Sequence, residues 1–263
     1  GNDFVIIDNR QKITNLSKEQ IIKICDRNFV GCDQLIFIEK DNISDARLKF
    51  FNSDGGESGA CGNGTRCVAD LISKENYNKT IILTTPSGNL KSEILENNLV
   101  TTEIGIAKTK WNEIPLSNEF DTLNLNIKIN DINNNEYHGG TAVNVGNPHV
   151  IFFMNEIENF EITKIGPHIE NHKIFPEKCN VTIAKVVNKN LIKVKVWERG
   201  AGLTKACGTA ACATAFAGLI NNLTNKNTDI EFETGKLSIF IDEKNSIHMK
   251  GPVSDIEEIL IKL

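Results

Sequence analysis

One stretch in the first half of the chain recurs in the second half, and this repeat constrains the fold more than any other feature of the sequence. Residues 47–64 (RLKFFNSDGGESGACGNG) align with residues 193–210 (KVKVWERGAGLTKACGTA) at an offset of 146. Residues 1–5 (GNDFV) align with residues 146–150 (GNPHV) at an offset of 145. Matches that keep one register over this length, to within one residue, indicate the duplication of one structural half.

Each half has the pattern of an α+β arrangement in which strands dominate. Short runs rich in β-branched residues and bounded by Gly, Pro or Asn predict strands over Leu35–Glu39, Leu48–Phe51, Ile81–Thr84, Leu90–Leu95 and Val100–Ile104. Ser17 and Gln20 form a capping box that predicts a helix over Lys18–Arg27. The polar stretches Asn130–Tyr137 and Asn221–Thr228 predict loops.

A further helix follows the repeated cysteine in each half. In the first half, Gly64, Cys67, Val68, Leu71 and Ile72 recur at helical spacing. Its counterpart in the second half is apolar and small on every side, over Gly208–Ile220. A helix that is apolar all round is buried all round, so we expect strands to wrap a central helix.

The composition of the chain excludes several classes of binding partner and of cofactor. Of the 263 residues, 29 are Lys or Arg and 34 are Asp or Glu, without a basic cluster, which argues against nucleic acid or an anionic membrane as partner. The longest apolar runs, such as Val150–Met154, are far too short to span a membrane. Seven cysteines, an odd number without a secretory signal, predict reduced thiols in the cytoplasm. No zinc-ligand spacing, nucleotide fingerprint or candidate pyridoxal lysine occurs, so we expect neither metal nor cofactor.

Cys61 and Cys207 occupy equivalent positions where a glycine-containing loop enters a helix. The dipole and the free N–H groups at a helix N-terminus favour a thiolate, and we expect the pKa of both thiols to lie below its ordinary value. The same N–H groups, on residues 62–63 and 208–209, are suited to bind a carboxylate. One thiolate as base and one thiol as acid suit racemisation or epimerisation next to a carboxylate, because a proton leaves one face of the carbon and returns to the other.

The remaining thiols and imidazoles lack such a pattern. We interpret five cysteines as packing residues: Cys25, Cys67 and Cys212 in helices, and Cys32 and Cys179 at equivalent turns. We interpret four histidines as surface or packing residues: His138, His168, His172 and His248. A hydrolase with a single cysteine nucleophile and His149 is conceivable chemically, but it gives no role to the second thiol of the pair.

The sequence resembles the diaminopimelate epimerase family in seven blocks that run the length of the chain in the family's order. They are Gly1–Val5, Gly31–Gln34, Phe51–Cys67, Gly146–His149, Phe175–Asn180, Trp197–Gly202 and Ala206–Cys212. A lone Cys-Gly pair is a weak signal, whereas all seven blocks together are specific. The resemblance implies cofactor-independent interconversion of LL- and meso-2,6-diaminopimelate, in lysine and peptidoglycan precursor synthesis.

The resemblance also implies roles for individual residues. It makes Cys61 and Cys207 the acid/base pair, and it places on the carboxylate of the reacting centre Gly62, Asn63, Gly208 and Thr209. It assigns substrate binding to a set of neutral side chains, Asn2, Gln34, Asn52, Asn147 and Asn180, together with the charged Glu198 and Arg199. His149 and Glu198 match positions that tune the thiol pKa values, and a His next to a thiolate can hold a compensating charge.

The predicted fold has two pseudo-symmetric α+β lobes, each a mixed, barrel-like sheet around a central helix. The first lobe comprises residues 1–107 and, by the resemblance, the C-terminal segment 253–263, and the second comprises residues 108–252. The resemblance implies a homodimer. Members of the family have a short strand-forming segment before the GNDFV block with which this sequence begins, and we expect the loss of an edge strand to weaken the placement of Asn2. Thr209 stands where Ser is common and Cys179 where Val is usual.

Two alternatives remain open at this point. A proline or hydroxyproline racemase of the same fold would also use paired thiols, but its short ring substrate would not need the set of asparagines. A protein without catalytic activity, either a binding protein or a thiol redox switch, would instead close a disulfide between Cys61 and Cys207.

Overall fold

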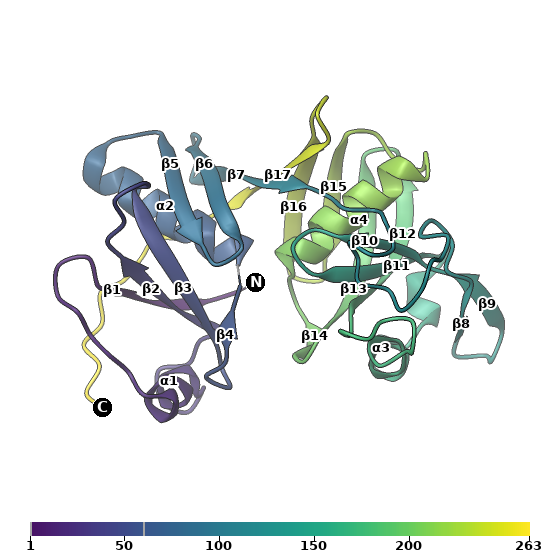
Figure 1. The fold of residues 1–263 in the computed structure, drawn as a ribbon, viewed down its shortest axis with the longest axis horizontal. Coiled ribbons are helices and arrows are strands. Elements are labelled where there is room, and N and C mark those ends of the chain that lie inside the picture. The colour runs from purple at the N-terminus through teal and green to yellow at the C-terminus, as the bar shows by residue number, and fades with distance from the viewer. Residues whose placement is uncertain (1, 60) are drawn as a thin grey trace. The chain divides into compact units, whose positions relative to one another are not determined.

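The computed structural model describes residues 2–59 and 61–263, so Gly1 and Ala60 of the sequence blocks lie outside the described residues. The chain divides into two compact units. The first unit comprises Asn2–Glu103 and Lys250–Leu263, and the second unit comprises Ile104–Met249. The fold is mixed α/β and mostly strands, with four α-helices in the described part of the chain (Figure 1). None of these helices combines the length and apolar character needed to cross a membrane.

Among its described residues, the first unit contains seven paired strands and two helices (Figure 1). Its elements are β1 (Phe4–Asp8), α1 (Lys18–Cys25), β2 (Gln34–Glu39), β3 (Ala46–Asn52), β4 (Glu57–Ser58), α2 (Gly62–Asn76), β5 (Thr80–Thr85), β6 (Gly88–Ile94) and β7 (Leu99–Ile106). The strand order is β1-β2-β3-β5-β6-β7, and the short β4 pairs with β3. Helix α2 packs on β5 and β6 and buries Val68, Ala69 and Ile72 in the core.

The second unit has the larger set of strands (Figure 1). Its elements are β8 (Ile127–Asn130), β9 (Glu136–Gly139), β10 (Thr141–Asn144), β11 (Pro148–Phe153), the 3-10 turn η1 (Ile157–Asn159), α3 (Ile162–Glu170), β12 (Asn180–Asn188), β13 (Leu191–Glu198), β14 (Gly202–Thr204), α4 (Gly208–Ile220), β15 (Asn227–Phe232), β16 (Gly235–Ile241) and β17 (Ser246–Pro252). The strand order is β10-β11-β12-β13-β15-β16-β17, with β14 paired to β13 and β8-β9 forming a separate hairpin.

The two units share one pattern of strand pairing. In the first, β1–β2 and β3–β5 are parallel, whereas β2–β3 and β5–β6 are antiparallel. In the second, β11–β12 and β13–β15 are parallel, whereas β12–β13 and β15–β16 are antiparallel. Even the register corresponds, because Phe4 lies opposite Gln34 and His149 lies opposite Asn180.

Helix α4 is buried on all sides, as its composition predicts. Every residue from Ala210 to Gly218 is buried, and the helix contacts β10, β11, β12, β15 and β16 (Figure 1). Small side chains permit this close approach. At Gly218, for example, a Cβ atom would lie only 2.7 Å from the Thr224 hydroxyl oxygen.

The local predictions for the first unit are confirmed to within two residues. All five predicted strands are present, as β2, β3, β5, β6 and β7. The capping box is also present, since the Gln20 N–H donates to Ser17 Oγ over 3.3 Å and the Ser17 N–H donates to Gln20 Oε1 over 2.8 Å. The predicted helix Lys18–Arg27 ends early, at Cys25, because Asp26 has an extended backbone.

The prediction of a loop over Asn130–Tyr137 is wrong at both ends, because this segment is the tip of the β8–β9 hairpin. The Asp131 carboxylate accepts hydrogen bonds of 2.8 Å from the backbone N–H groups of both Asn133 and Asn135, which closes a short turn. The strands can therefore extend almost to the tip. The other predicted loop, Asn221–Thr228, is correct except that β15 takes its last two residues.

Substitution of Gly166 by Ala should destabilise the second unit. A Cβ atom at this position in α3 would lie 2.3 Å from Cγ and 2.6 Å from Cβ of Trp197, and neither the indole ring nor its stem can bend away. We expect Gly166→Ala to lower the free energy of unfolding by about 2 kcal/mol, measured by urea denaturation. Gly139→Ala is the control, because its Cβ would meet open space among the described residues. Equal midpoints for the two variants would contradict the prediction.

Candidate active site

Cys61 and Cys207 begin their helices in the same conformation. Each is the N-cap residue of its helix, with φ −143° and ψ 104° at Cys61 and φ −139° and ψ 112° at Cys207. At α2, the Gly64 N–H donates to Cys61 Sγ over 3.4 Å. The prediction that Cys-Gly opens a helix in each half is therefore confirmed. The N–H groups of the first helical turn have no carbonyl partner within the helix, which suits them to an anionic ligand.

In the first unit, a row of hydrogen bonds fixes two of the predicted substrate-binding amides. Asn63 Nδ2 donates to Asn2 Oδ1 over 2.6 Å, and Asn2 Nδ2 donates to Asp33 Oδ2 over 3.0 Å. At the other end, Arg66 Nη2 donates to Asn63 Oδ1 over 3.0 Å. Each amide therefore has its oxygen toward a donor and its nitrogen toward an acceptor. Arg66 was not among the predicted site residues, although its spacing of three residues from Asn63 on a helix was a usable signal.

The first unit also brings together two other predicted residues and anchors Asp33. Gln34 and Asn52 lie opposite each other on β2 and β3, and Gln34 Nε2 donates to Asn52 Oδ1 over 2.8 Å. Arg27 binds Asp33 over 2.6 Å and Asp3 over 2.5 Å. The hydrogen bond from Arg27 lowers the pKa of Asp3, which favours the ionised carboxylate in this ion pair.

In the second unit, a buried imidazole connects the predicted residues. His149 Nε2 lies 2.8 Å from Asn147 Oδ1 and 3.4 Å from Asn180 Nδ2. Asn180 Oδ1 accepts the backbone N–H of Arg199 over 2.9 Å, and Arg199 Nη1 donates to the carbonyl oxygen of Glu177 over 2.9 Å. The turn that carries Arg199 is thus tied to the Asn180 side chain, which lies beside His149.

The environment of Cys207 opposes ionisation. The residue is 5% exposed, and its Sγ lies 3.4 Å from Thr209 Oγ1. Burial raises the pKa of the Cys207 thiol well above its ordinary value, and the Glu198 carboxylate raises it further. The prediction of a lowered pKa is therefore wrong for this thiol, because the loss of hydration outweighs the helix dipole.

His149 is neutral in this environment. Burial lowers the pKa of the imidazole to about 3, and the positive charge of Arg199 acts in the same direction. The prediction that His149 holds a compensating positive charge is therefore wrong. A neutral ring that carries its N–H on Nε2 can donate to Asn147 Oδ1, so it can still orient Asn147.

The other cysteines have the surroundings of packing residues. The sulfur atoms of Cys25 and Cys32 lie 3.4 Å apart in the core, and burial raises the pKa of both thiols, that of Cys32 to about 12. Cys179 Sγ lies 3.8 Å from the carbonyl oxygen of Ile169, and burial raises its pKa as well. Cys67 lies within the first-unit core at α2, where burial again raises the pKa.

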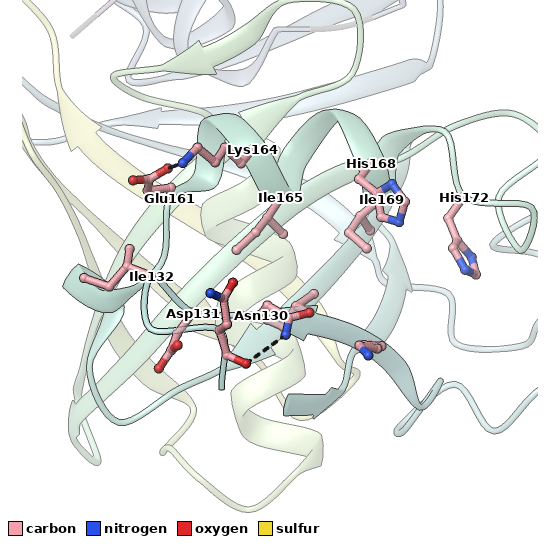
Figure 2. Close-up of a pocket in the computed structure, with 12 residues that line it drawn as sticks. Asn130, Asp131, Ile132, Glu161, Lys164, Ile165, His168, Ile169 and His172 are labelled. Atoms are coloured by element: carbon pink, nitrogen blue, oxygen red, sulfur yellow. Dashed lines mark hydrogen bonds and ion pairs between the residues drawn. The ribbon is translucent and has the colours of Figure 1, made fainter. Parts of the chain in front are cut away.

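The second unit also has a cavity of about 410 Å³ between α3 and the β8–β9 hairpin (Figure 2). Among the residues along it are His168 and His172 on one side and Asn130 and Asp131 on the other, as Figure 2 shows. None of the predicted site residues lines this cavity. Within residues 2–59 and 61–263, no group of three or more His, Cys, Asp or Glu side chains is arranged to hold a metal ion.

A neutral His149 has a measurable consequence. With a pKa of about 3 in the folded chain, the imidazole should show no change of chemical shift between pH 5 and pH 8 in NMR spectra. Free histidine added as an internal control should titrate with a midpoint near pH 6.5 in the same spectra. The unfolded chain binds the proton and the folded chain does not, so this residue makes the fold less stable as the pH falls from about 6.5 toward 3. A His149 signal that titrates with the control would contradict the prediction.

Solved structures share the fold. A protein described as a predicted epimerase from Pseudomonas aeruginosa superposes with a TM-score of 0.70 at 13% identity, over 100% of this chain and 94% of that one. A hydroxyproline epimerase from Agrobacterium vitis superposes with a TM-score of 0.64 at 11% identity, over 89% of this chain and 77% of that one. At these identities the likeness concerns the fold alone.

Sequence comparison is more specific. The family model described as diaminopimelate epimerase matches residues 1–110 and 141–256. The diaminopimelate epimerase of Pelagibacter ubique is 69% identical over all of this chain and 96% of its own length, and that of Acidiphilium cryptum is 38% identical over 98% of this chain and 92% of its own length. The resemblance found in the seven sequence blocks is thereby confirmed, and the chain belongs to the diaminopimelate epimerase family.

Proposed function

We propose that this member of the family interconverts LL- and meso-2,6-diaminopimelate without a cofactor, with Cys61 and Cys207 as the acid/base pair. Identity of 69% along the full chain to a diaminopimelate epimerase supports the reaction. One observation carries the assignment of the thiols. Two cysteines, one in each unit, cap the N-terminus of a helix with nearly the same backbone angles.

The reaction exchanges one proton for another at the α-carbon. One thiolate removes the α-proton, the electron pair of the broken C–H bond moves onto the carbon and its carboxylate, and the other thiol donates its proton to the opposite face. In the reverse direction the two residues exchange roles. The raised pKa of Cys207 favours its thiol form, which is the form that donates. The proposal requires both thiols to act on the same α-carbon.

The helix ends stabilise the charge that develops during the reaction. When the α-proton leaves, negative charge spreads onto the carboxylate. N–H groups at the start of α2 (Gly62, Asn63) and of α4 (Gly208, Thr209) are the donors that we propose for it. Donors that are fixed before the reaction stabilise the transition state without reorganisation.

The remaining side chains are proposed to recognise the rest of the substrate. Its ammonium and carboxylate groups need neutral acceptors and donors, for which we propose Asn2, Gln34, Asn52, Asn147 and Asn180. Glu198 and Arg199 supply one negative and one positive charge, and a guanidinium can bind a carboxylate through two hydrogen bonds. His149 acts by orienting Asn147, and Glu198 acts also by raising the pKa of Cys207.

We further propose that the fold arose by internal duplication, with barrel-like lobes at residues 1–107 plus 253–263 and residues 108–252. The shared pairing pattern and the corresponding register of β1–β2 and β11–β12 support the duplication. Assembly as a homodimer and a cytoplasmic location stay predictions from the resemblance and the cysteine content.

Removal of either thiol should abolish the exchange of the α-proton. We expect Cys61→Ser and Cys207→Ser each to lower the rate by about 10²–10⁴-fold, the usual contribution of a general acid or base. The measurement is deuterium incorporation at the α-carbon of LL-diaminopimelate in D₂O with a reductant, followed by mass spectrometry. Cys67→Ala and Cys212→Ala, on the same two helices, are matched controls that should retain turnover. Full epimerase turnover by both Cys61→Ala and Cys207→Ala would refute the mechanism.

The same assay separates the alternatives. The Agrobacterium vitis protein of this fold is a hydroxyproline epimerase solved with trans-4-hydroxy-L-proline, so proline and hydroxyproline should be offered as substrates. Turnover of these without diaminopimelate would favour the racemase alternative. A disulfide between Cys61 and Cys207 without exchange into any amino acid would favour the redox switch.

A further inference from the structure

The geometry points to Glu170, at the end of α3, as a positioning residue that holds the turn carrying Glu198 and Arg199. The inference rests on the proposed function, in which these two charged residues bind the substrate. Glu170 itself has no place among the proposed binding residues. Its role is to keep the charged turn in one conformation before the substrate arrives.

The Glu170 carboxylate binds the chain on both sides of the charged pair. Its Oε2 accepts the indole N–H of Trp197 over 2.7 Å, and its Oε1 accepts the backbone N–H of Gly200 over 3.1 Å. Trp197 directly precedes Glu198, and Gly200 directly follows Arg199. One side chain therefore fixes both ends of a four-residue segment.

Hydrogen bonds and a nearby cation offset the cost of burying the Glu170 carboxylate. The Glu170 side chain is 8% exposed, and burial of an unpaired charge would be costly. Its two N–H partners form charge-assisted hydrogen bonds, which are stronger than neutral ones. Lys178 Nζ, 3.8 Å from Oε1, adds a weaker attraction because its own side chain is 54% exposed.

The Trp197 ring is itself held by packing, so the hydrogen bond has a rigid partner. Gly166, one helical turn before Glu170, leaves room for the indole, since a Cβ atom there would lie 2.3 Å from Trp197 Cγ. On the other side, Gly202 has φ +85°, and a Cβ atom there would lie 3.5 Å from the ring. Glu198 and Gly202 pair with each other at the ends of the β13–β14 turn, and Trp197 pairs with Leu203.

Loss of the Glu170 charge should weaken substrate binding more than it slows the chemistry. Glu170→Gln keeps the size of the side chain but leaves an amide nitrogen unable to accept one of the two N–H groups. The substrate must then order the turn as it binds, which raises KM. The helix N-termini are unchanged by the substitution, and Glu198 keeps its effect on Cys207 because its backbone stays paired with Gly202, so kcat should stay within about twofold.

The experiment measures kcat and KM of the full chain for LL-diaminopimelate. We expect Glu170→Gln to raise KM about tenfold, which corresponds to about 1.4 kcal/mol. Glu161→Gln is the matched control, because Glu161 lies at the other end of the same helix, exposed and paired with Lys164, and should leave both constants unchanged. Trp197→Phe removes the indole N–H donor and one ring of the side chain but keeps an aromatic ring in place, so it tests the same contact if Glu170→Gln folds poorly.

The kinetic constants of these variants, compared with those of the cysteine variants, decide the inference. A raised KM in Glu170→Gln and Trp197→Phe, with a double variant no worse than Glu170→Gln alone, would support it, because residues that act through one contact are not additive. An unchanged KM, or a loss confined to kcat, would overturn it. If the Cys61 and Cys207 variants lose exchange while Glu170→Gln matches the unsubstituted chain, only this inference fails. If the cysteine variants keep full turnover, the proposed function fails first.

Discussion

The chemistry of this chain depends on a cysteine placed at the N-cap of a helix that is packed into a core. Two effects act in opposite directions on such a thiol. The helix N-terminus favours an anion by about 0.3–1 kcal/mol, or about 2 in a partly buried geometry. Full burial shifts a pKa by up to about 3–5 units, and each unit corresponds to about 1.4 kcal/mol. At Cys207, which is 5% exposed and next to the Glu198 carboxylate, burial prevails.

Because burial outweighs the helix dipole at Cys207, the side chain can act as a proton donor and the backbone N–H groups can bind an anion. A thiol that resists ionisation keeps its proton available for donation, while the helix N–H groups remain free of a competing thiolate and can serve a carboxylate. The burial that causes the balance comes from the sequence of α4, where Ala210–Gly218 packs against strands on all sides. The composition of the helix and the protonation state of its cap are thus connected.

Much of this arrangement could be predicted from the sequence because it depends on local patterns. The repeat gave the equivalence of Cys61 and Cys207, the capping box gave the start of α1, and β-branched runs gave the strands of the first unit. The charge of His149 could not be predicted, because it depends on burial created when β11 pairs with β12.

Contacts between residues far apart in the sequence could not be predicted from the spacing of residues either. Glu170 lies 30 residues before Gly200, and no spacing rule relates them. The hairpin at Asn130–Tyr137 was missed for a different reason. A polar run of asparagines is typical of a loop. Here the Asp131 carboxylate accepts hydrogen bonds from two backbone N–H groups, so the loop is reduced to a short turn.

In the first unit, the hydrogen-bonded amides are oriented by a charged side chain at each end of the chain of hydrogen bonds. In the first unit, Arg66 donates to the amide of Asn63, which donates to Asn2, which in turn donates to Asp33. A cation at one end and an anion at the other align every amide dipole in the row.

In the second unit, Asn180 Oδ1 accepts a hydrogen bond from the backbone N–H of Arg199. The Asn180 amide nitrogen must then face His149 and the carbonyl oxygen of Pro148. The shorter contact of His149 Nε2, 2.8 Å to Asn147 Oδ1, needs an N–H on that nitrogen, so the Asn180 amide is fixed by Pro148 and Arg199 rather than by the imidazole. Arg199 therefore acts on both residues, because its charge helps to lower the pKa of His149 and its backbone N–H fixes the orientation of the Asn180 amide.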